Sequence, residues 1–250
     1  MPLFATIKSW ALTIKSDLAK ALVLLSLLSV PRFILVLQAN MSGQYQWVSV
    51  IFIIMMLLPW LLLNRKGRRE IGIQKPRNIF GLLVSAVLGL ICAVVIYYVM
   101  LIIFGDGISH PYRYIARSYS QIPVETLDTD RLMFFLIYSM IGMTFSPLGE
   151  ELFYRGLVHE YFARRFGHRK ASFLDSAAFA VVHLAHFGII YEQGNWQWLL
   201  WPSLAWVLGL FLTCRVFFWA RQKSGAIWGA VAAHAAFNLG MNYFIFFHLL

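Results

Sequence analysis

The chain has 250 residues, of which 60% are hydrophobic and only 13% are charged. A soluble domain contains about 25% charged residues, so this composition excludes an ordinary water-soluble protein. The formal net charge of +10 would suggest nucleic-acid binding in a soluble protein, but here Lys and Arg stand in short clusters between apolar runs, where they set membrane topology. We therefore expect one all-α membrane domain over residues 1–250 that contacts the lipid bilayer and no nucleic acid.

Seven apolar runs follow one another along the chain, and each is long enough for a helix to cross the hydrocarbon. They cover residues 21–39, 46–63, 79–103, 131–162, 171–190, 196–219 and 225–248. These runs predict a polytopic transmembrane helical bundle of about seven spans. The first run contains Pro31 and Arg32. Proline removes a helical N–H and arginine is costly in lipid, so we expect this run to be broken, tilted or re-entrant.

The basic clusters stand at alternate ends of the apolar runs. They are Lys8, Lys15 and Lys20; Arg65, Lys66, Arg68 and Arg69; Arg164, Arg165, Arg169 and Lys170; and Arg215, Arg221 and Lys223. The positive-inside rule makes these ends cytoplasmic. It predicts a multi-pass protein of the cell (inner) membrane with its N-terminus in the cytoplasm and its C-terminus outside. The connection from Gly105 to Asp130 then lies outside, where we expect it to cap the outer mouth of the bundle.

The two cysteines, Cys92 and Cys214, lie inside apolar runs and form no CxxC pair. Neither a disulfide framework nor a thiol metal site is therefore expected. We interpret both as buried filler.

Three of the apolar runs carry polar residues, which are expensive in hydrocarbon unless they are paired or face a wet cavity. They are Glu150, Glu151 and Arg155 in the fourth run, His183 and His186 in the fifth, and His234 and Asn238 in the seventh. Counting at ~1.5 Å per helical residue, Glu150 lies about 22 Å before Arg165, His183 about 20 Å after Lys170, and His234 about 16 Å after Lys223. These similar depths predict a single pocket inside the membrane.

The spacing of these residues indicates which of them are structural and which are free for chemistry. Glu151 and Arg155 are four residues apart and can form an ion pair on one helix face, whereas Glu150 is rotated by about 100° and is left free for chemistry. Phe179 and His183 are also four apart, which sets an aromatic ring beside the imidazole.

Glu150 is the predicted general base that acts on water. His183, His234 and Asn238 are candidates to orient that water, to protonate the leaving amine or to stabilise the oxyanion. His186, three residues after His183, is a further candidate for lining the pocket.

Zinc is the alternative to a metal-free site, because Glu150, His183 and His234 are residue types that bind it. An HExxH-like string begins at His159 and Glu160, but Ala163 stands where the second imidazole is needed. We expect no metal and no other cofactor.

The three strings Glu150-Glu151-x-x-x-Arg155, Phe179-x-x-x-His183 and His234-x-x-x-Asn238 resemble, in this order, the motifs of the CAAX-protease and bacteriocin-processing (Abi) family of intramembrane endopeptidases. The resemblance covers residues 131–245. It implies a glutamate-type peptidase in which Glu150 and His183 activate water, Glu151 and Arg155 support the site, and His234 and Asn238 stabilise the oxyanion.

By the same resemblance, residues 131–248 are the catalytic core, and residues 1–130 contribute an outer loop and generic helices. The implied substrate is a membrane-anchored protein or peptide. The compact string Glu150 to Gly156 favours bacterial protein processing or C-terminal sorting over prenyl-protein maturation.

A second class of function uses the same polar cluster without catalysis, as in an immunity factor or a small transporter. It predicts that Glu150→Gln leaves the biological role intact. Transport is disfavoured, because the sequence has no pair of corresponding interrupted helices of the inverted-repeat kind.

Overall fold

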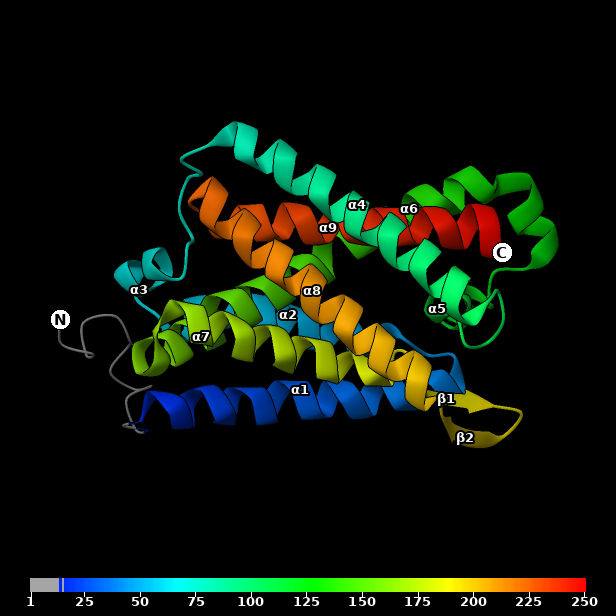
Figure 1. Cartoon of the computed structure of the whole chain (residues 1–250), viewed down its shortest axis with the longest axis horizontal. Coiled ribbons are helices and arrows are strands. Elements are labelled where there is room, and N and C mark those ends of the chain that lie inside the picture. Colours follow the sequence, from blue (N-terminus) through cyan, green and yellow to red (C-terminus); the bar gives the residue numbers. More distant parts are fainter. Residues whose placement is uncertain (1–13, 15) are drawn as a thin grey trace.

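The protein, seen here as a computed structural model that describes residue 14 and residues 16–250, is a bundle of long helices (Figure 1). The α-helices are α1 (Asp17–Ser42), α2 (Gln46–Leu62), α3 (Arg65–Glu70), α4 (Ile79–Phe104), α5 (Pro111–Ala116), α6 (Val124–Glu150), α7 (His159–Val182), α8 (Leu200–Ser224) and α9 (Ile227–Phe244). The 3-10 helices are η3 (Arg117–Tyr119) and η5 (His183–Ala185), and the π-helices are η4 (Glu151–Val158) and η6 (Ile245–Leu249). An antiparallel hairpin joins β1 (Ile189–Glu192) to β2 (Asn195–Trp198).

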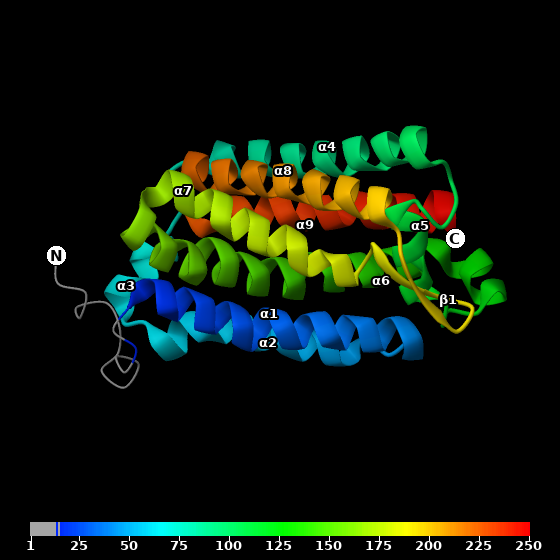
Figure 2. The same cartoon turned by 60° about the horizontal axis from the view of Figure 1, so that its bottom comes forward.

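The all-α polytopic bundle predicted from the apolar runs is confirmed. Within the described residues, five helical stretches are long and apolar enough to cross a membrane: Asp17–Ser42, Ile79–Phe104, Val124–Ala185, Leu200–Ser224 and Ile227–Leu249. The apolar helix α2 is shorter, so the count of seven spans stays a prediction. The stretch Val124–Ala185 holds α6, η4 and α7, and the chain reverses its direction within α7 (Figure 2). The turn lies at Gly167, whose φ of 79° is a conformation that glycine adopts freely.

The first apolar run is one unbroken helix, which corrects the expectation that Pro31 and Arg32 break it or make it re-entrant. Pro31 costs the helix one N–H but does not end it. Arg32 is only 1% exposed, and it faces a carboxylate inside the bundle instead of lipid. The cost of arginine in hydrocarbon is thereby offset by an ion pair.

Two connections differ from the sequence prediction. The segment expected to be an outer loop contains α5, whose Tyr112 is fully buried and donates its hydroxyl to the carbonyl of Ala93 at 3.0 Å. The run 196–219 was expected to be helical from its start, but its first residues belong to β2, and α8 begins at Leu200. Gln193 and Gly194, with φ of 49° and 82°, form the turn that folds this segment into a hairpin.

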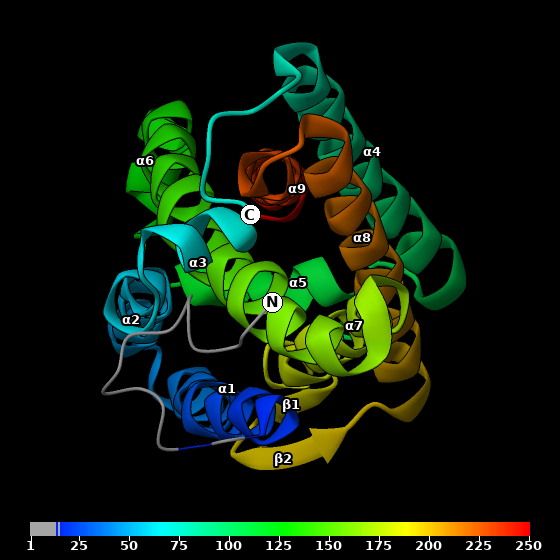
Figure 3. The same cartoon turned by 90° about the vertical axis from the view of Figure 1, so that its left-hand side faces the viewer.

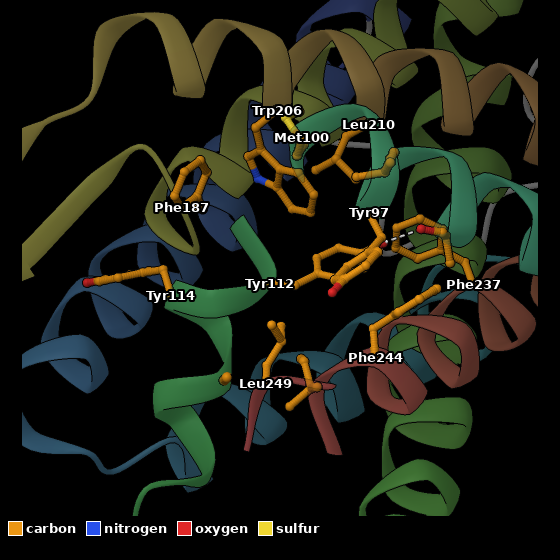
Figure 4. Packing of buried hydrophobic residues seen from close by; sticks show 14 of the residues in the cluster. Tyr97, Met100, Tyr112, Tyr114, Phe187, Trp206, Leu210, Phe237, Phe244 and Leu249 are labelled. Carbon is orange, nitrogen blue, oxygen red and sulfur yellow. Dashed lines mark hydrogen bonds between the residues drawn. The ribbon is translucent and has the colours of Figure 1, made fainter. Parts of the chain in front are cut away.

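Helix α9 lies inside the bundle between α6 on one side and α4 with α8 on the other (Figure 3). Small residues let these helices approach closely. A Cβ on Gly89 of α4 would lie 1.9 Å from the carbonyl oxygen of Ala233 on α9, and a Cβ on Gly149 of α6 would lie 2.4 Å from that of Phe52 on α2. Figure 4 shows the aromatic core where α4, α5, α8 and α9 meet.

The two ends of the bundle differ in charge. Helix α3, the turn at Gly167 and the C-terminal end of α8, which carry three of the basic clusters, lie at the same end (Figure 2). Lys8 and Lys15 of the first cluster lie outside the described residues. The common placement agrees with the alternation in the sequence, while the assignment of this end to the cytoplasm stays a prediction.

Candidate active site

Glu150 is the last residue of α6 and is completely buried. Ser146, one helical turn earlier, donates its hydroxyl to Oε2 of Glu150 at 2.6 Å. The π-helix η4 begins at the next residue, and such irregular turns are frequent at functional sites. Close packing of Gly149 on the backbone of Phe52 fixes this part of α6. The carboxylate of Glu150 is therefore held by its own helix in one orientation.

Two imidazoles approach Glu150 from other helices. Nε2 of His183 lies 3.8 Å from Oε1, and Nε2 of His234 lies 3.8 Å from Oε2. The three residues come from α6, η5 and α9, which are separate elements of the fold. The structure thus brings together the carboxylate and the two imidazoles whose similar depths predicted a shared pocket.

The tautomer of His183 follows from its hydrogen bond. Nδ1 lies 2.7 Å from the carbonyl oxygen of Phe179, which can only accept, so Nδ1 carries the proton. In the neutral ring Nε2 is then the acceptor, and it lies 3.2 Å from Nη2 of Arg32. The ring of Phe179 stacks on that of His183 at 4.2 Å between centroids, as their four-residue spacing predicted. Trp206 donates to the backbone carbonyl of His183 at 3.3 Å and so ties η5 to α8.

His234 is held between the two neighbouring glutamates. Its Nδ1 donates to Oε1 of Glu151 at 2.9 Å, and its ring stacks on that of Phe217 at 5.0 Å. In the neutral ring, Nε2 therefore carries no proton, and its lone pair faces Glu150. Glu151 therefore orients His234, a contact that the sequence spacing did not predict.

Glu151 and Arg155 form the predicted ion pair, with 3.3 Å between Oε1 and Nη1. Both side chains are completely buried. The Arg155 guanidinium also lies over the ring of Phe179, 4.3 Å from its centroid. Glu151 is thus engaged with two partners. Glu150 is not left free as the spacing predicted, because Ser146 donates to its Oε2 at 2.6 Å and Nη2 of Arg32 lies 2.8 Å from its Oε1.

Asn238 lies one turn after His234 on α9 and is half-buried. Its amide nitrogen donates to the carbonyl of Gly142 on α6 at 2.9 Å. This bond uses one of the two amide hydrogens and fixes the plane of the group.

Arg32 of α1 is the member of the site that sequence reasoning missed. Its Nη2 lies 2.8 Å from Oε1 of Glu150, 3.2 Å from Nε2 of His183 and 3.3 Å from Nε2 of His186. The expectation that the N-terminal region adds only generic helices is therefore wrong. The signal was present, because a charged residue in the middle of an apolar run marks a functional site by default. The same contact brings His186 into the cluster.

A second polar cluster, also missed, continues from Arg155 toward the basic end. Asp175 of α7 is completely buried, 3.9 Å from Nε of Arg155, and it accepts from Nδ1 of His159 at 2.7 Å. His159 in turn lies 3.1 Å from His168 at the rim of a cavity of about 270 Å³. The HExxH-like string thus serves an ion-pair network, and its Glu160 pairs with Arg164.

The donors at Glu150 form a poor set for a metal ion. Among the described residues, no group of three or more His, Cys, Asp or Glu side chains could hold one. The Arg32 guanidinium touches Oε1 of Glu150 and Nε2 of His183, which are the atoms that zinc bound by these residues would need. A fixed positive charge there opposes a divalent cation.

Comparison with known proteins finds a family model that matches part of the chain. Residues 132–240 match a family model described as type II CAAX prenyl endopeptidase Rce1-like. The matched segment contains Glu150, His183, His234 and Asn238 but not Arg32. No curated protein and no solved structure matches the chain. The matched family is one of endopeptidases, and the long apolar helices indicate a multi-pass membrane protein.

Proposed function

We propose that this chain hydrolyses a peptide bond of a membrane-anchored protein with a water activated by Glu150 and His183. Its residues 132–240 match the model of the type II CAAX prenyl endopeptidase Rce1-like family. The observation that carries the proposal is the position of Glu150, a buried carboxylate with an imidazole nitrogen 3.8 Å from each of its oxygens. Carboxylates and imidazoles are the groups that general base catalysis requires.

The reaction follows from the acceptors that these residues present. Glu150 takes a proton from a water molecule whose other hydrogen is accepted by Nε2 of His183, while the two hydrogens on Nη2 of Arg32 point to Glu150 and His186. The water oxygen attacks the scissile carbonyl carbon and forms a tetrahedral intermediate. The proton then passes from Glu150 to the leaving nitrogen, directly or through His234, and the C–N bond breaks. The products are a carboxylic acid and an amine, so atoms and protons balance.

The developing oxyanion needs hydrogen-bond donors that are already in place. Asn238 supplies one, because its bond to the carbonyl of Gly142 leaves the second amide hydrogen free to donate. His234 lies one helical turn away and supplies a second donor when it carries the proton received from Glu150. In this assignment Glu151 and Arg155 keep His234 in position.

The mechanism that we propose uses no metal. Glu150 lies 2.8 Å from a guanidinium nitrogen of Arg32, which provides the positive charge at this position. The ionised carboxylate itself is then the base, as in a glutamate-type peptidase.

The substrate class that we favour is a protein held in the membrane by a C-terminal segment, cut in bacterial protein processing or sorting. The site residues lie on the helices Val124–Ala185 and Ile227–Leu249, both long enough to cross the bilayer. A substrate segment in the bilayer reaches such a site without leaving the lipid. A prenylated C-terminus, which the description of the family names, is the second substrate to test.

The decisive experiment measures cleavage by the purified protein in lipid vesicles. One reporter carries a C-terminal membrane anchor, and a second ends in a prenylated peptide. Glu150→Gln and His183→Ala should each lower kcat by about 100- to 10,000-fold, the usual contribution of general acid–base catalysis. Glu125→Gln and His248→Ala, which change exposed residues of the same types, should retain wild-type rates.

Two outcomes would contradict the proposal. One is near-normal cleavage by a folded Glu150→Gln variant, as judged by its thermal unfolding. The other is a cell in which Glu150→Gln preserves the biological role of the protein, because a binding or immunity function tolerates that change and catalysis does not.

A further inference from the structure

Arg32 meets the candidate active site through one nitrogen. The side chain is 1% exposed, and its Nη2 is within 3.3 Å of Glu150, His183 and His186. A guanidinium Nη2 carries two hydrogens, so it can serve only two of these three acceptors at once. Among the described residues, its Nε and Nη1 atoms have no hydrogen-bond partner. The guanidinium therefore interacts with the site through its positive charge more than through hydrogen bonds.

The contact has consequences for protonation. His183 carries its proton on Nδ1, which donates to the carbonyl of Phe179. Its Nε2 must therefore be unprotonated to approach a guanidinium at 3.2 Å. A positive charge beside an imidazole disfavours a second proton on the ring, and the same charge beside a carboxylate favours its ionised form. Arg32 thus acts on both residues in the direction that water activation requires.

Within the part of the chain that the structure describes, no guanidinium or ammonium group other than that of Arg32 contacts Glu150. The groups around it are Arg32 from α1, His183 and His186 from η5 and the segment after it, His234 from α9, and Glu151 with Tyr154 and Arg155 from η4. The ring of Phe52 from α2 and the hydroxyl of Ser146 carry no charge. Arg155 already faces Glu151 and Asp175. Loss of Arg32 would leave the buried carboxylate of Glu150 without the guanidinium that contacts it, and proton uptake by the carboxylate would relieve the cost of that buried charge.

We propose that Arg32 is a positioning residue that keeps Glu150 ionised and His183 neutral, so that both are proton acceptors for the same water. The proposal rests on the proposed function for its catalytic meaning, but the charge states themselves can be measured without activity. It assigns to α1, outside the segment matched by the family, a part in the chemistry.

Infrared difference spectroscopy tests the charge states directly, because a protonated carboxyl has a carbonyl stretch distinct from the carboxylate bands. The Glu150→Gln minus wild-type spectrum at neutral pH should show loss of carboxylate bands and no loss of an acid band. Arg32→Gln should gain an acid band that is absent from Arg32→Gln/Glu150→Gln. Arg32→Lys, which keeps the charge, should gain none. Arg113→Gln, which removes an exposed ion pair with Asp106, is the matched control and should leave the acid region unchanged.

The activity assay gives the second readout. Arg32→Gln should lower kcat at neutral pH by at least about 100-fold, recover as the pH is raised, and change KM little. Arg32→Lys should restore most of the rate, with the acid side of its pH profile close to that of the wild type.

The outcomes separate the two proposals. An acid band assigned to Glu150 in the wild type, or an Arg32→Gln variant with wild-type rate and profile, would overturn the role of Arg32 while Glu150→Gln remains inactive. An active Glu150→Gln would overturn the proposed function, and the infrared result would still report on the charge of Glu150. Wild type, Glu150→Gln and Arg32→Lys decide the question if Arg32→Gln does not fold.

Discussion

His234 donates through Nδ1 to Oε1 of Glu151 at 2.9 Å and turns Nε2 toward Oε2 of Glu150 at 3.8 Å. The two adjacent glutamates thus have different contacts with one imidazole. Glu151 accepts a hydrogen bond that fixes the ring, and Glu150 faces the unprotonated nitrogen. Glu150 ends α6, and Glu151 begins the π-helix η4. Its bond to His234 and its ion pair with Arg155 make Glu151 the structural carboxylate of the pair.

Glu151→Gln should destabilise the protein by about 3–5 kcal/mol, because it removes one partner of a completely buried ion pair and leaves the charge of Arg155 poorly compensated. The measurement is chemical unfolding in detergent micelles, followed by circular dichroism. Glu192→Gln is the control, since its ion pair with Arg117 is solvent-exposed and should be worth less than about 1 kcal/mol. Equal stability of the two variants would argue against the structural role of Glu151.

Gly149→Ala should destabilise the protein by about 1–3 kcal/mol and displace the neighbouring Glu150, because the new methyl group would lie 2.4 Å from the carbonyl oxygen of Phe52. Unfolding and cleavage are measured on the same preparation, and both should be impaired. Gly107→Ala is the matched control, since nothing lies within 4 Å of the added atom. Its stability should stay within about 0.5 kcal/mol of the wild type. If Gly149→Ala changed neither the stability nor the rate of cleavage, α6 and α2 would pack less closely than described.

Asn238→Ala should lower kcat by about 100- to 1,000-fold with little change in KM, as expected when an oxyanion donor is lost. Asn242→Ala is the comparison, one turn farther along α9, where the amide pairs with Tyr119 and Ser139. Losing those bonds should cost about 1 kcal/mol of stability and leave kcat unchanged. If Asn238→Ala behaves like Asn242→Ala, then Asn238 only links α9 to α6.

Chelator treatment should leave the rate of cleavage unchanged, because the positive charge at Glu150 comes from Arg32. Elemental analysis of the purified protein should find zinc well below one ion per chain. Stoichiometric zinc that is lost together with activity, and restored with it, would replace the glutamate mechanism by a metal-dependent one.

Much of the site was readable from the sequence because its residues stand in short local patterns. The spacing of Glu151 and Arg155, and that of Phe179 and His183, predicted contacts that the structure contains. Counting helical residues from the basic clusters predicted the convergence of Glu150 with two imidazoles. These arguments worked because helix geometry converts sequence distance into spatial distance.

Other features could not be read in this way. Arg32 was expected to disrupt its apolar run, because the carboxylate that pairs with it belongs to a helix in the other half of the chain. Asp175 is a charge inside an apolar run, but its partners could not be predicted, since Arg155 and His159 lie across the turn at Gly167. The β-hairpin that precedes α8 interrupts a segment apolar enough to be mistaken for helix.

The sequence by itself determined that the chain is a helical membrane protein and which helices carry its reactive groups, because hydrophobic length and helical periodicity are local properties. Only the tertiary structure decided which charges from distant parts of the chain meet. Arg32 reaches Glu150 and Glu151 reaches His234 through the packing of α1, α6, η4 and α9. Buried charges are stable only where that packing supplies a partner, and partners distant in the chain leave no local pattern.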